Sequence, residues 1–453
     1  MRVEGKRILV IGMARSGIAA AELLLTHGAI PVLSDKRNLD AFEGKLDPLV
    51  GTACEFRLGE DAAALLSEVE GVVISPGVPI DAPVAEAAKS QGIPLVGELE
   101  LAFSYLQGEV LALTGTNGKT TTVTLLGKIF ENTGRTAFVA GNIGYPLSAV
   151  ALESKKDDVV VTEVSSFQLE SIKTFRPKVA ALLNIAEDHL NRHGTMAQYA
   201  KLKRRLFENQ QETDVAVLNL DDPVVAEMAS RLKSRVVYFS RTQPVEEGAC
   251  VENGKVVWCE NGEKRLICDV DAILIPGPHN LENALAATAM AITMGIPGPV
   301  IRHTLQTFPG VEHRIETVRE FEGVTYINDS KGTNADSTMK AVQSMKVPTV
   351  LILGGCDKQM DFRPLCVEIQ ASDMIHHVVV LGETAEQINR SLLAVGYGAI
   401  SRAGSLEEAI AQSRAVAKNG GNVLLSPACA SFDMFQDYEH RGRVFKELVN
   451  QLS

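Results

Sequence analysis

The stretch Thr114-Gly115-Thr116-Asn117-Gly118-Lys119-Thr120-Thr121-Thr122 is the most informative part of this chain. The apolar residues 109–113 before it predict a buried strand, and the apolar spacing of residues 123–130 predicts a helix. A Gly-rich turn between strand and helix directs backbone N–H groups and the helix dipole at one spot, which suits a polyphosphate. Lys119 is placed to reach the outer phosphates, and the Thr120 hydroxyl can ligate Mg²⁺.

The alternative interpretation of this stretch is a plain Gly-Asn-Gly turn followed by an ordinary lysine. The pattern G-x-x-G-K-T is also shorter than the common phosphate loop G-x-x-x-x-G-K-[ST]. The complete order of strand, Gly, Lys-Thr and helix nevertheless predicts a protein that binds ATP.

The composition is that of an ordinary soluble protein, with 45% hydrophobic and 22% charged residues among 453. This length predicts about three domains. The formal net charge of −12 argues against nucleic acid and anionic membranes as partners but leaves anionic small molecules open. Nothing in the sequence demands an oligomer, so we expect a monomer.

The cysteine pattern and the N-terminus indicate the compartment. The 7 cysteines are scattered without a C-x-x-C pair, as is typical of a reducing environment. A strand is predicted almost at the start of the chain, so no signal peptide is expected, and the longest apolar stretch, residues 284–296, is too short to span a membrane. We therefore expect a cytoplasmic protein.

Strand-like runs alternate with helical patterns almost throughout, which predicts α/β domains with parallel sheets. The boundaries fall near residues 97 and 308, giving domains at 1–97, 98–308 and 309–453. Asn-Gly pairs at 253–254 and 261–262 predict a small antiparallel appendage within residues 249–275. The predicted strands are 7–11, 30–34, 71–77, 110–114, 136–140, 158–164, 178–184, 214–220, 235–240, 324–328, 349–353, 377–381 and 422–426.

The first turn, residues 12–17, resembles a dinucleotide-binding fingerprint, with Asp35 at the end of the following strand. Ala14 replaces the middle Gly of G-x-G-x-x-G, so the backbone cannot approach a pyrophosphate as closely. A nucleotide other than NAD is therefore expected, with a plain strand-to-helix turn as the alternative.

Two further candidate residues lie at strand ends, where ligands gather in open α/β sheets. Glu163 closes a strand and suits a Mg²⁺ ligand beside the phosphate loop. His189 follows the strand ending at 184, and the acidic residues Glu187 and Asp188 could fix its tautomer. A lone histidine is more often a surface residue, but this position favours a functional role.

In the third domain, three polar loops each leave a predicted strand, at residues 328–334, 354–358 and 426–433. Each loop alone is equally well explained as a solvated connection. Together they hold Lys331, Lys358 and Ser431, which predicts a site for a small anion such as a carboxylate.

These motifs together resemble the Mur ligases, the ATP-dependent amino-acid-adding enzymes of peptidoglycan synthesis. The resemblance covers essentially the whole chain. Within the family, residues 426–433 and the N-terminal turn are similar to the branch that adds D-glutamate to UDP-N-acetylmuramoyl-L-alanine. The matching motifs are TGTNGKTT (114–121), TEVSSFQLE (162–170), EDHL (187–190), GPHNLEN (277–283), HR (313–314) and NDSKGTN (328–334).

The resemblance implies a Rossmann-like N-terminal domain that binds the UDP group and a central P-loop-type ATPase domain. A Rossmann-like C-terminal domain would bind the amino acid. ATP and two Mg²⁺ ions are implied, with Mn²⁺ as a substitute. An acyl phosphate on the nucleotide substrate would precede attack by the amine of D-glutamate, in cytoplasmic peptidoglycan precursor synthesis.

The family pattern also implies site residues. The ATP site would comprise Gly115, Thr116, Asn117, Gly118, Lys119, Thr120, Thr121, Asn280, Asn283, Arg314 and Asp329. The UDP-substrate site would comprise Arg15, Ser16, Asp35, Ser75, Pro76, Gly77, Asn142 and His189. The D-glutamate site would comprise Lys331, Thr333, Lys358, Ser431 and Phe432. The metal ligands would be Thr120, Glu163, His189 and a carbamylated Lys203, and the catalytic residues Lys119, His189 and Lys203.

Three positions qualify this mapping. The carbamylated lysine follows a tyrosine by four residues in the family, which places it at Lys203 after Tyr199, with Lys201 close by as an alternative. Asn191 stands where many relatives carry Asp, and Tyr438 stands near a position that tends to carry Phe, without an assigned role.

Several other functions remain open from the sequence. A sister ligase adding L-Lys, meso-diaminopimelate or L-Ala, or a folylpolyglutamate synthase, would share the fold. A regulatory nucleotide-binding protein without turnover is a rival from another class. An NAD oxidoreductase is disfavoured by Ala14.

Overall fold

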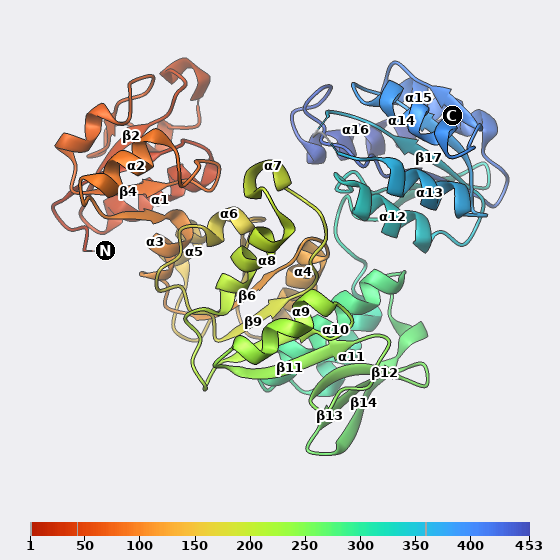
Figure 1. Cartoon of the computed structure of the whole chain (residues 1–453), viewed down its shortest axis with the longest axis horizontal. Helices are drawn as coiled ribbons and strands as arrows, with labels where there is room; N and C mark the ends of the chain where they lie inside the picture. The colour runs from red at the N-terminus through yellow and green to blue at the C-terminus, as the bar shows by residue number, and fades with distance from the viewer. Residues whose placement is uncertain (1, 43, 358–359) are drawn as a thin grey trace. The chain divides into compact units, whose positions relative to one another are not determined.

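The computed structural model describes residues 2–42, 44–357 and 360–453. Within these residues the strands form three sheets, of 5, 9 and 6 strands, connected mostly by helices (Figure 1). The described residues divide into two compact units. The first contains residues up to 185, 189–272 and 282–306, and the second contains 186–188, 273–281 and 307–453. The predicted α/β class is confirmed, whereas the predicted domain boundaries stay predictions.

The first sheet is parallel, with the order β3-β2-β1-β4-β5. Its central strand β1 alternates between two cores, because Ile8 and Val10 contact the cluster that includes helix α1 while Leu9 and Ile11 contact the cluster that includes α2. Burial on both faces explains why these strands are almost continuously apolar. The elements are β1 (Arg7–Ile11), α1 (Arg15–Thr26), β2 (Ile30–Ser34), β3 (Glu55–Phe56), β4 (Gly71–Ile74), α2 (Pro83–Ser90) and β5 (Leu95–Gly97).

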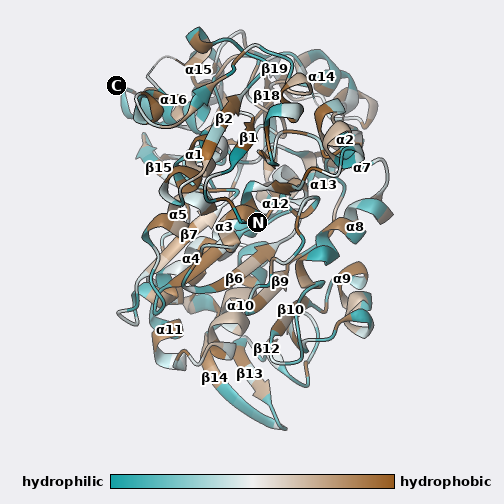
Figure 2. Ribbon diagram, turned by 90° about the vertical axis from the view of Figure 1, so that its left-hand side faces the viewer, coloured by the Kyte–Doolittle hydropathy of each residue, from teal (hydrophilic) through white to brown (hydrophobic). Residues whose placement is uncertain are grey.

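The second sheet has the order β14-β13-β12-β11-β10-β9-β6-β8-β7. Strands β6 to β11 are parallel to one another, and most of their residues are hydrophobic (Figure 2). The strands are β6 (Glu109–Thr114), β7 (Ala137–Gly141), β8 (Val159–Glu163), β9 (Val179–Leu182), β10 (Val215–Asn219), β11 (Arg235–Ser240), β12 (Gly248–Glu252), β13 (Lys255–Glu260) and β14 (Glu263–Asp269). The helices that follow β6, β7 and β8 are α4 (Lys119–Glu131), α5 (Leu147–Glu153) and α6 (Ser166–Leu169).

The predicted antiparallel appendage is present, but it continues the central sheet instead of standing apart from it. Strand β12 pairs in parallel with β11 and antiparallel with β13. Asn253 and Asn261 adopt φ values of 50° and 53°, the left-handed conformation that tight hairpin turns require. The Asn-Gly signal therefore identified both hairpins correctly.

The sheet of the second unit has the order β15-β16-β20-β17-β18-β19. Alternate residues of its inner strands enter two cores, one with α12, α13 and α14 and the other with α15 and α16. The elements are β15 (Glu316–Phe321), β16 (Val324–Asn328), α12 (Ala335–Ser344), β17 (Thr349–Leu353), α13 (Arg363–Ala371), β18 (Ile375–Val380), α14 (Ala385–Ala394), β19 (Ile400–Arg402), α15 (Leu406–Val416), β20 (Asn422–Leu425) and α16 (Tyr438–Asn450). Among the described residues, we find no helix with the length and apolarity needed to cross a bilayer.

Helix α3 (Glu98–Phe103) follows β5 and carries two buried carboxylates. Glu100 accepts hydrogen bonds from the backbone N–H groups of Lys173 (2.8 Å), Thr174 (2.7 Å) and Phe175 (3.1 Å). Glu98 accepts one from Ser148 N–H at 2.7 Å, and complete burial raises the pKa of its carboxyl despite that bond. These carboxylates fix α3 to the start of α5 and to the loop before β9.

Glu100→Ala should lower the free energy of unfolding of the first unit by roughly 3 kcal/mol, because it leaves one buried and two partly buried N–H groups without an acceptor. Urea titration followed by circular dichroism measures this change. The matched control is Glu86→Ala, which removes an exposed ion pair with Lys89 and should cost about 1 kcal/mol or less. Equal losses for the two variants would contradict the assigned role of Glu100.

Candidate active site

The predicted phosphate loop leaves β6 and enters α4 at Lys119, as expected. Gly118 has φ 83°, and a Cβ atom there would collide with the side-chain oxygen of Asn283. Asn283 lies on helix α10 (Pro278–Thr293), so the structure brings this predicted ATP residue onto the loop. Asn280 lies one turn earlier on the same helix, where its amide donates to the carbonyl of Pro276 at 2.7 Å.

Asn184 holds the loop in place, a role that the sequence did not reveal. Its side-chain oxygen accepts from Asn117 N–H at 2.9 Å and its amide donates to the Asn117 carbonyl at 3.1 Å. Its backbone carbonyl accepts from Thr116 N–H at 3.0 Å. Asn184 was visible only as the last residue of a predicted strand, and the pairing of β6 with β9 is what places it beside the loop.

The ammonium of Lys119 lies within the loop, donating to the carbonyls of Gly115 (3.0 Å) and Thr116 (2.8 Å). Together with the N–H groups at the start of α4, it gives the loop a positive electrostatic character. This arrangement suits a polyphosphate.

Glu163 is the centre of an oxygen-rich cluster beside the loop. Its carboxylate accepts from the Thr120 hydroxyl and from the Asn142 side-chain amide, each at 2.9 Å. Strand pairing explains the meeting, because Glu163 ends β8 opposite Leu113 of β6 and Gly141 of β7. The Thr120 hydroxyl, the Glu163 carboxylate and the Asn142 carbonyl oxygen are the kind of ligands that Mg²⁺ takes, so these residues fit the predicted metal.

Helix α8 (Met196–Arg204) turns Lys203 toward the loop and Lys201 away from it. Lys203 is only 1% exposed, and its ammonium donates to the Gly115 carbonyl at 2.7 Å and to the Thr114 hydroxyl at 3.3 Å. The Tyr199 ring lies 4.6 Å from that ammonium. Lys201 is exposed and borders a surface hollow with Arg204 and Arg231. Of the two lysines, Lys203 is the one with direct contacts to the phosphate loop.

His189 adopts φ 53° at the start of α7 (Leu190–His193), and its ring centroid lies 4.9 Å from that of Phe167. A second histidine, His193, was not singled out from the sequence. Its Nε2 lies 2.9 Å from the Ser166 hydroxyl, and its ring stacks on Tyr199 at 5.4 Å. His193 thus joins α7 to the helix that carries Lys203.

An open pocket at the carboxyl edge of the first sheet contains most of the predicted UDP-substrate residues. The register pairs Ile11 with both Ser34 and Ile74, so the segments that follow these strands meet there. Arg15 lies beside this region and donates to the Gly144 carbonyl at 2.8 Å. The pocket is lined by the predicted residues Ser16, Asp35, Ser75, Pro76, Gly77 and Asn142. It is also lined by Gly12 and Ala14 of the N-terminal turn and by Arg37, Val78, Gly141 and Gln168, which the predicted UDP-substrate site does not include.

Asp35 forms a bidentate ion pair with Arg37, with both N–O distances at 3.0 Å, and accepts from Met13 N–H at 2.9 Å. Burial alone would raise the pKa of this carboxyl, but the hydrogen bonds from Arg37 and from the backbone outweigh it and lower the pKa to about 2. Arg37 also lies over the Phe42 ring at 4.4 Å. The hydrogen bond to Met13 N–H fixes the turn at residues 12–13, and the ion pair places Arg37 in the pocket.

Arg314 and Asp329 belong to the second unit. Asp329 is fully buried, accepts from the Ser426 hydroxyl at 2.7 Å and lies 3.7 Å from the Arg314 guanidinium. Burial raises the pKa of the Asp329 carboxyl, and the nearby positive charge of Arg314 opposes this effect. The structure thus pairs these two predicted ATP residues with each other, and their role toward ATP stays a prediction.

The polar loops of the second unit leave strands that are neighbours in its sheet. Strand β20 lies between β16 and β17, so the loops after residues 328, 353 and 425 start at one edge. Lys331 and Thr333 lie in the first loop, and Ser431, which is buried, and Phe432, which is 71% exposed, lie in the third. Lys358 lies outside the described residues.

Arg441 of α16 joins two of these loops, although no sequence pattern indicated this role. Its guanidinium is buried and donates to the Ser330 carbonyl (2.8 Å), the Ser330 hydroxyl (3.0 Å) and the carbonyls of Cys429 (3.2 Å) and Ala430 (3.3 Å). Burial lowers the pKa of this guanidinium to about 10, so it stays charged at neutral pH. It holds the loops bearing Lys331 and Ser431 in one arrangement.

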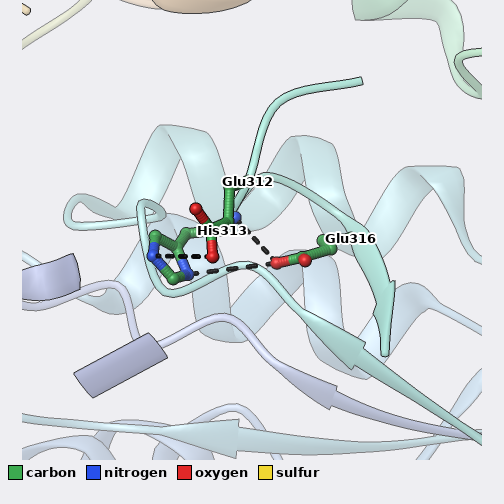
Figure 3. A group of neighbouring side chains, drawn as sticks. All are labelled: Glu312, His313 and Glu316. Atoms are coloured by element: carbon green, nitrogen blue, oxygen red, sulfur yellow. Dashed lines mark hydrogen bonds and ion pairs between the residues drawn. The ribbon is translucent and has the colours of Figure 1, made fainter. Parts of the chain in front are cut away.

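Three side chains at the start of β15, Glu312, His313 and Glu316, converge as metal ligands could (Figure 3). Lys446 already pairs with both carboxylates, at 2.9 Å and 2.6 Å. Burial lowers the pKa of His313 despite its two acidic neighbours, and its Nδ1 lies 2.9 Å from the Asn328 amide. We interpret the group as an ion-pair network that fixes the turn carrying Arg314.

Comparison with known proteins gives a consistent result over all three sheets. The model of the Mur ligase MurD-like N-terminal domain matches residues 6–97, that of the Mur ligase middle domain residues 113–291, and that of the Mur ligase glutamate ligase domain residues 313–429. A UDP-N-acetylmuramoylalanine--D-glutamate ligase of Thermoanaerobacter sp. (strain X514) is 45% identical over 454 aligned residues, covering 100% of both chains.

A UDP-N-acetylmuramoylalanine--D-glutamate ligase from Pelotomaculum thermopropionicum is 47% identical, and the alignment covers 99% of this chain and 98% of that ligase. Among solved structures, a pseudomurein peptide ligase type C from Methanothermus fervidus has a TM-score of 0.61 at 20% identity, covering 99% of this chain and 100% of its own. At that identity the structural likeness supports the fold alone.

The Asp35–Arg37 pair predicts a specific pH dependence. Because the folded pKa, about 2, lies below the ordinary value of 3.8, the ion pair stabilises the fold above about pH 4 and loses this effect as the pH falls toward 2. Carboxyl ¹³C NMR should therefore show Asp35 still ionised at pH 3. Arg37→Met should raise its pKa toward 3.8, whereas Arg57→Met, which breaks the exposed Arg57–Glu60 ion pair, should not. A wild-type Asp35 that titrates near pH 4 would contradict the assignment.

Proposed function

The chain belongs to the Mur ligase family of ATP-dependent ligases, and we propose that it joins D-glutamate to UDP-N-acetylmuramoyl-L-alanine. The observation that carries this proposal is the full-length similarity, at 45% and 47% identity, to ligases whose names state that activity. The site geometry supports it independently, since the phosphate loop, the Glu163 cluster and the polar loops of the second unit supply the groups that such a reaction needs.

In this proposal, ATP is bound by residues 115–121 with Asn280, Asn283, Arg314 and Asp329. Mg²⁺ is held by Thr120 and Glu163, and Mn²⁺ can replace it. Asn283 packs directly on the loop, which supports its assignment. When bound, the metal screens the repulsion between the carboxylate of the nucleotide substrate and the phosphates of ATP.

The proposed reaction has two steps. The terminal carboxylate of UDP-N-acetylmuramoyl-L-alanine attacks the γ-phosphate of ATP, forming an acyl phosphate and releasing ADP. The amine of D-glutamate then attacks the acyl carbon, the amide bond forms and phosphate leaves with a proton released from the amine. Lys119 stabilises the transferred phosphoryl group, whose negative charge is spread over its oxygens.

A second metal site is proposed at His189 and Lys203, with Lys203 as its carbamate. Carbamylation turns a buried cation into an anion, which nearby metal ions favour. The carbamate keeps one N–H donor, so the bond from Lys203 to the Gly115 carbonyl can persist after modification. The burial of Lys203 against the loop and the exposure of Lys201 support Lys203 as the modified residue.

The nucleotide substrate is proposed to bind in the pocket of the first sheet, through Arg15, Ser16, Asp35, residues 75–77 and Asn142, with His189 near its reactive end. D-Glutamate is proposed to bind at Lys331, Thr333, Lys358, Ser431 and Phe432. The ligase is proposed to work as a monomer in the cytoplasm, where its seven free thiols would stay reduced.

Phosphate release in the presence of ATP, Mg²⁺ and UDP-N-acetylmuramoyl-L-alanine tests the function directly. Release is expected with D-glutamate and not with L-lysine, because the polar loops present cationic and hydroxyl groups that suit an acidic side chain and repel an ammonium. L-Glutamate and meso-diaminopimelate are expected to give no release because the full-length relatives are named for D-glutamate. Release with another amino acid would keep the ligase chemistry and overturn the substrate assignment. No release with any of them would favour a regulatory nucleotide-binding protein.

Replacing each lysine of α8 separately tests the carbamate. Lys203→Met should lower kcat by roughly 10²-fold or more, the cost typical of removing a group that stabilises transition-state charge. Lys201→Met should leave kcat within about twofold, because Lys201 is exposed and points away from the loop. In ¹³C-bicarbonate buffer, a carbamate NMR signal is expected in the wild type and in Lys201→Met but not in Lys203→Met. Retention of the signal in Lys203→Met would contradict the proposal.

A further inference from the structure

Tyr438, the first residue of α16, contacts Lys331 in two ways. The Lys331 ammonium donates to the Tyr438 hydroxyl at 3.0 Å and lies 4.7 Å from the centre of the same ring. The hydroxyl in turn donates to a Glu439 carboxylate oxygen at 3.1 Å. These contacts form a chain from the cation through a hydroxyl to an anion.

We propose that Tyr438 is a positioning residue of the amino-acid site, and that its hydroxyl aims the Lys331 ammonium at the side-chain carboxylate of the incoming amino acid. This inference rests on the proposed function, which assigns Lys331 to that carboxylate.

The backbone around Tyr438 is fixed tightly enough for such a role. The Ser330 hydroxyl donates to the Tyr438 carbonyl at 2.7 Å, and Arg441 holds both the hydroxyl and the carbonyl of Ser330. Asp437 caps α16 by accepting from His440 N–H at 2.7 Å. The segment carrying Lys331 and the helix start carrying Tyr438 are therefore joined beside the contact between their side chains.

The chemistry of the three groups explains why a hydroxyl is useful here. Because Tyr438 donates its proton to Glu439, its oxygen lone pairs face the ammonium and fix one of the three N–H donors of Lys331. A neutral hydroxyl orients the ammonium without neutralising it, whereas a carboxylate in its place would compete with the substrate for the positive charge. The aromatic face adds a cation–π attraction that keeps the lysine stem against the ring.

Tyr438→Phe tests this role with the loss of a single oxygen atom. The KM for D-glutamate should rise about tenfold, in line with the loss of a hydrogen bond to a charged group, while the KM values for ATP and the nucleotide substrate stay unchanged and kcat stays within about twofold. Tyr397→Phe is the matched control. It removes a buried tyrosine hydroxyl that bonds the Ile375 carbonyl at 3.2 Å, away from the polar loops, and should leave every KM unchanged.

A double-mutant cycle separates positioning from a merely structural effect. In a Lys331→Met background, Tyr438→Phe should add no further rise in KM for D-glutamate, because the hydroxyl acts through Lys331. Additive effects, an unchanged KM in the single variant, or an equal rise in all three KM values would each overturn the inference. If the wild type itself releases no phosphate with D-glutamate, the proposed function fails and this inference falls with it; an active wild type with an unaffected Tyr438→Phe variant refutes the inference alone.

Discussion

The common edge of parallel strands is the constraint on which this structure depends. Parallel strands that lie side by side end at the same edge of their sheet, so whatever follows them meets there. In the central sheet, the neighbours β6, β8 and β9 bring the phosphate loop, Glu163 and Asn184 together. The same rule brings together the segments that line the pocket of the first sheet and the polar loops of the last one. The order of the strands therefore determines which loops meet at each candidate subsite, and the side chains on those loops then determine its chemistry.

Much of the fold could be predicted from the sequence, because buried parallel strands are apolar on both faces and leave a strong local signal. The missed strands have weak local signals. Strands β3 (Glu55–Phe56), β5 (Leu95–Gly97) and β19 (Ile400–Arg402) are too short for a pattern, and β15 carries Glu, Arg and Thr along an edge. The hairpins were predicted correctly, but their attachment to the central sheet depends on a pairing between β11 and β12 that no local pattern encodes.

The residues of the candidate site also fall into those that local sequence motifs indicate and those that only the structure reveals. Residues within contiguous motifs, such as Lys119, Thr120 and Glu163, could be named from the sequence. The structure places the Lys119 ammonium within the loop and the Thr120 hydroxyl on the Glu163 carboxylate. Asn184 and Arg441 could not, because their roles depend on partners distant in the sequence. Arg37 lies next to a predicted residue, yet only the geometry shows that it pairs with Asp35. Residue types can be read from the sequence, but the contacts that give these residues their roles cannot be predicted from it.

The strand order of the second unit has a consequence for how the protein is made. Strand β20, the last strand in the sequence, lies in the middle of its sheet, between β16 and β17. During synthesis, the strands already made remain two separate halves with unpaired inner edges until residues 422–425 leave the ribosome. The edge that carries the three polar loops is completed only then, and Arg441, which joins two of them, is synthesised later still. The arrangement of these loops is thus among the last features that the nascent chain acquires, and a ribosome stalled before residue 422 would expose two sheet edges prone to wrong pairing.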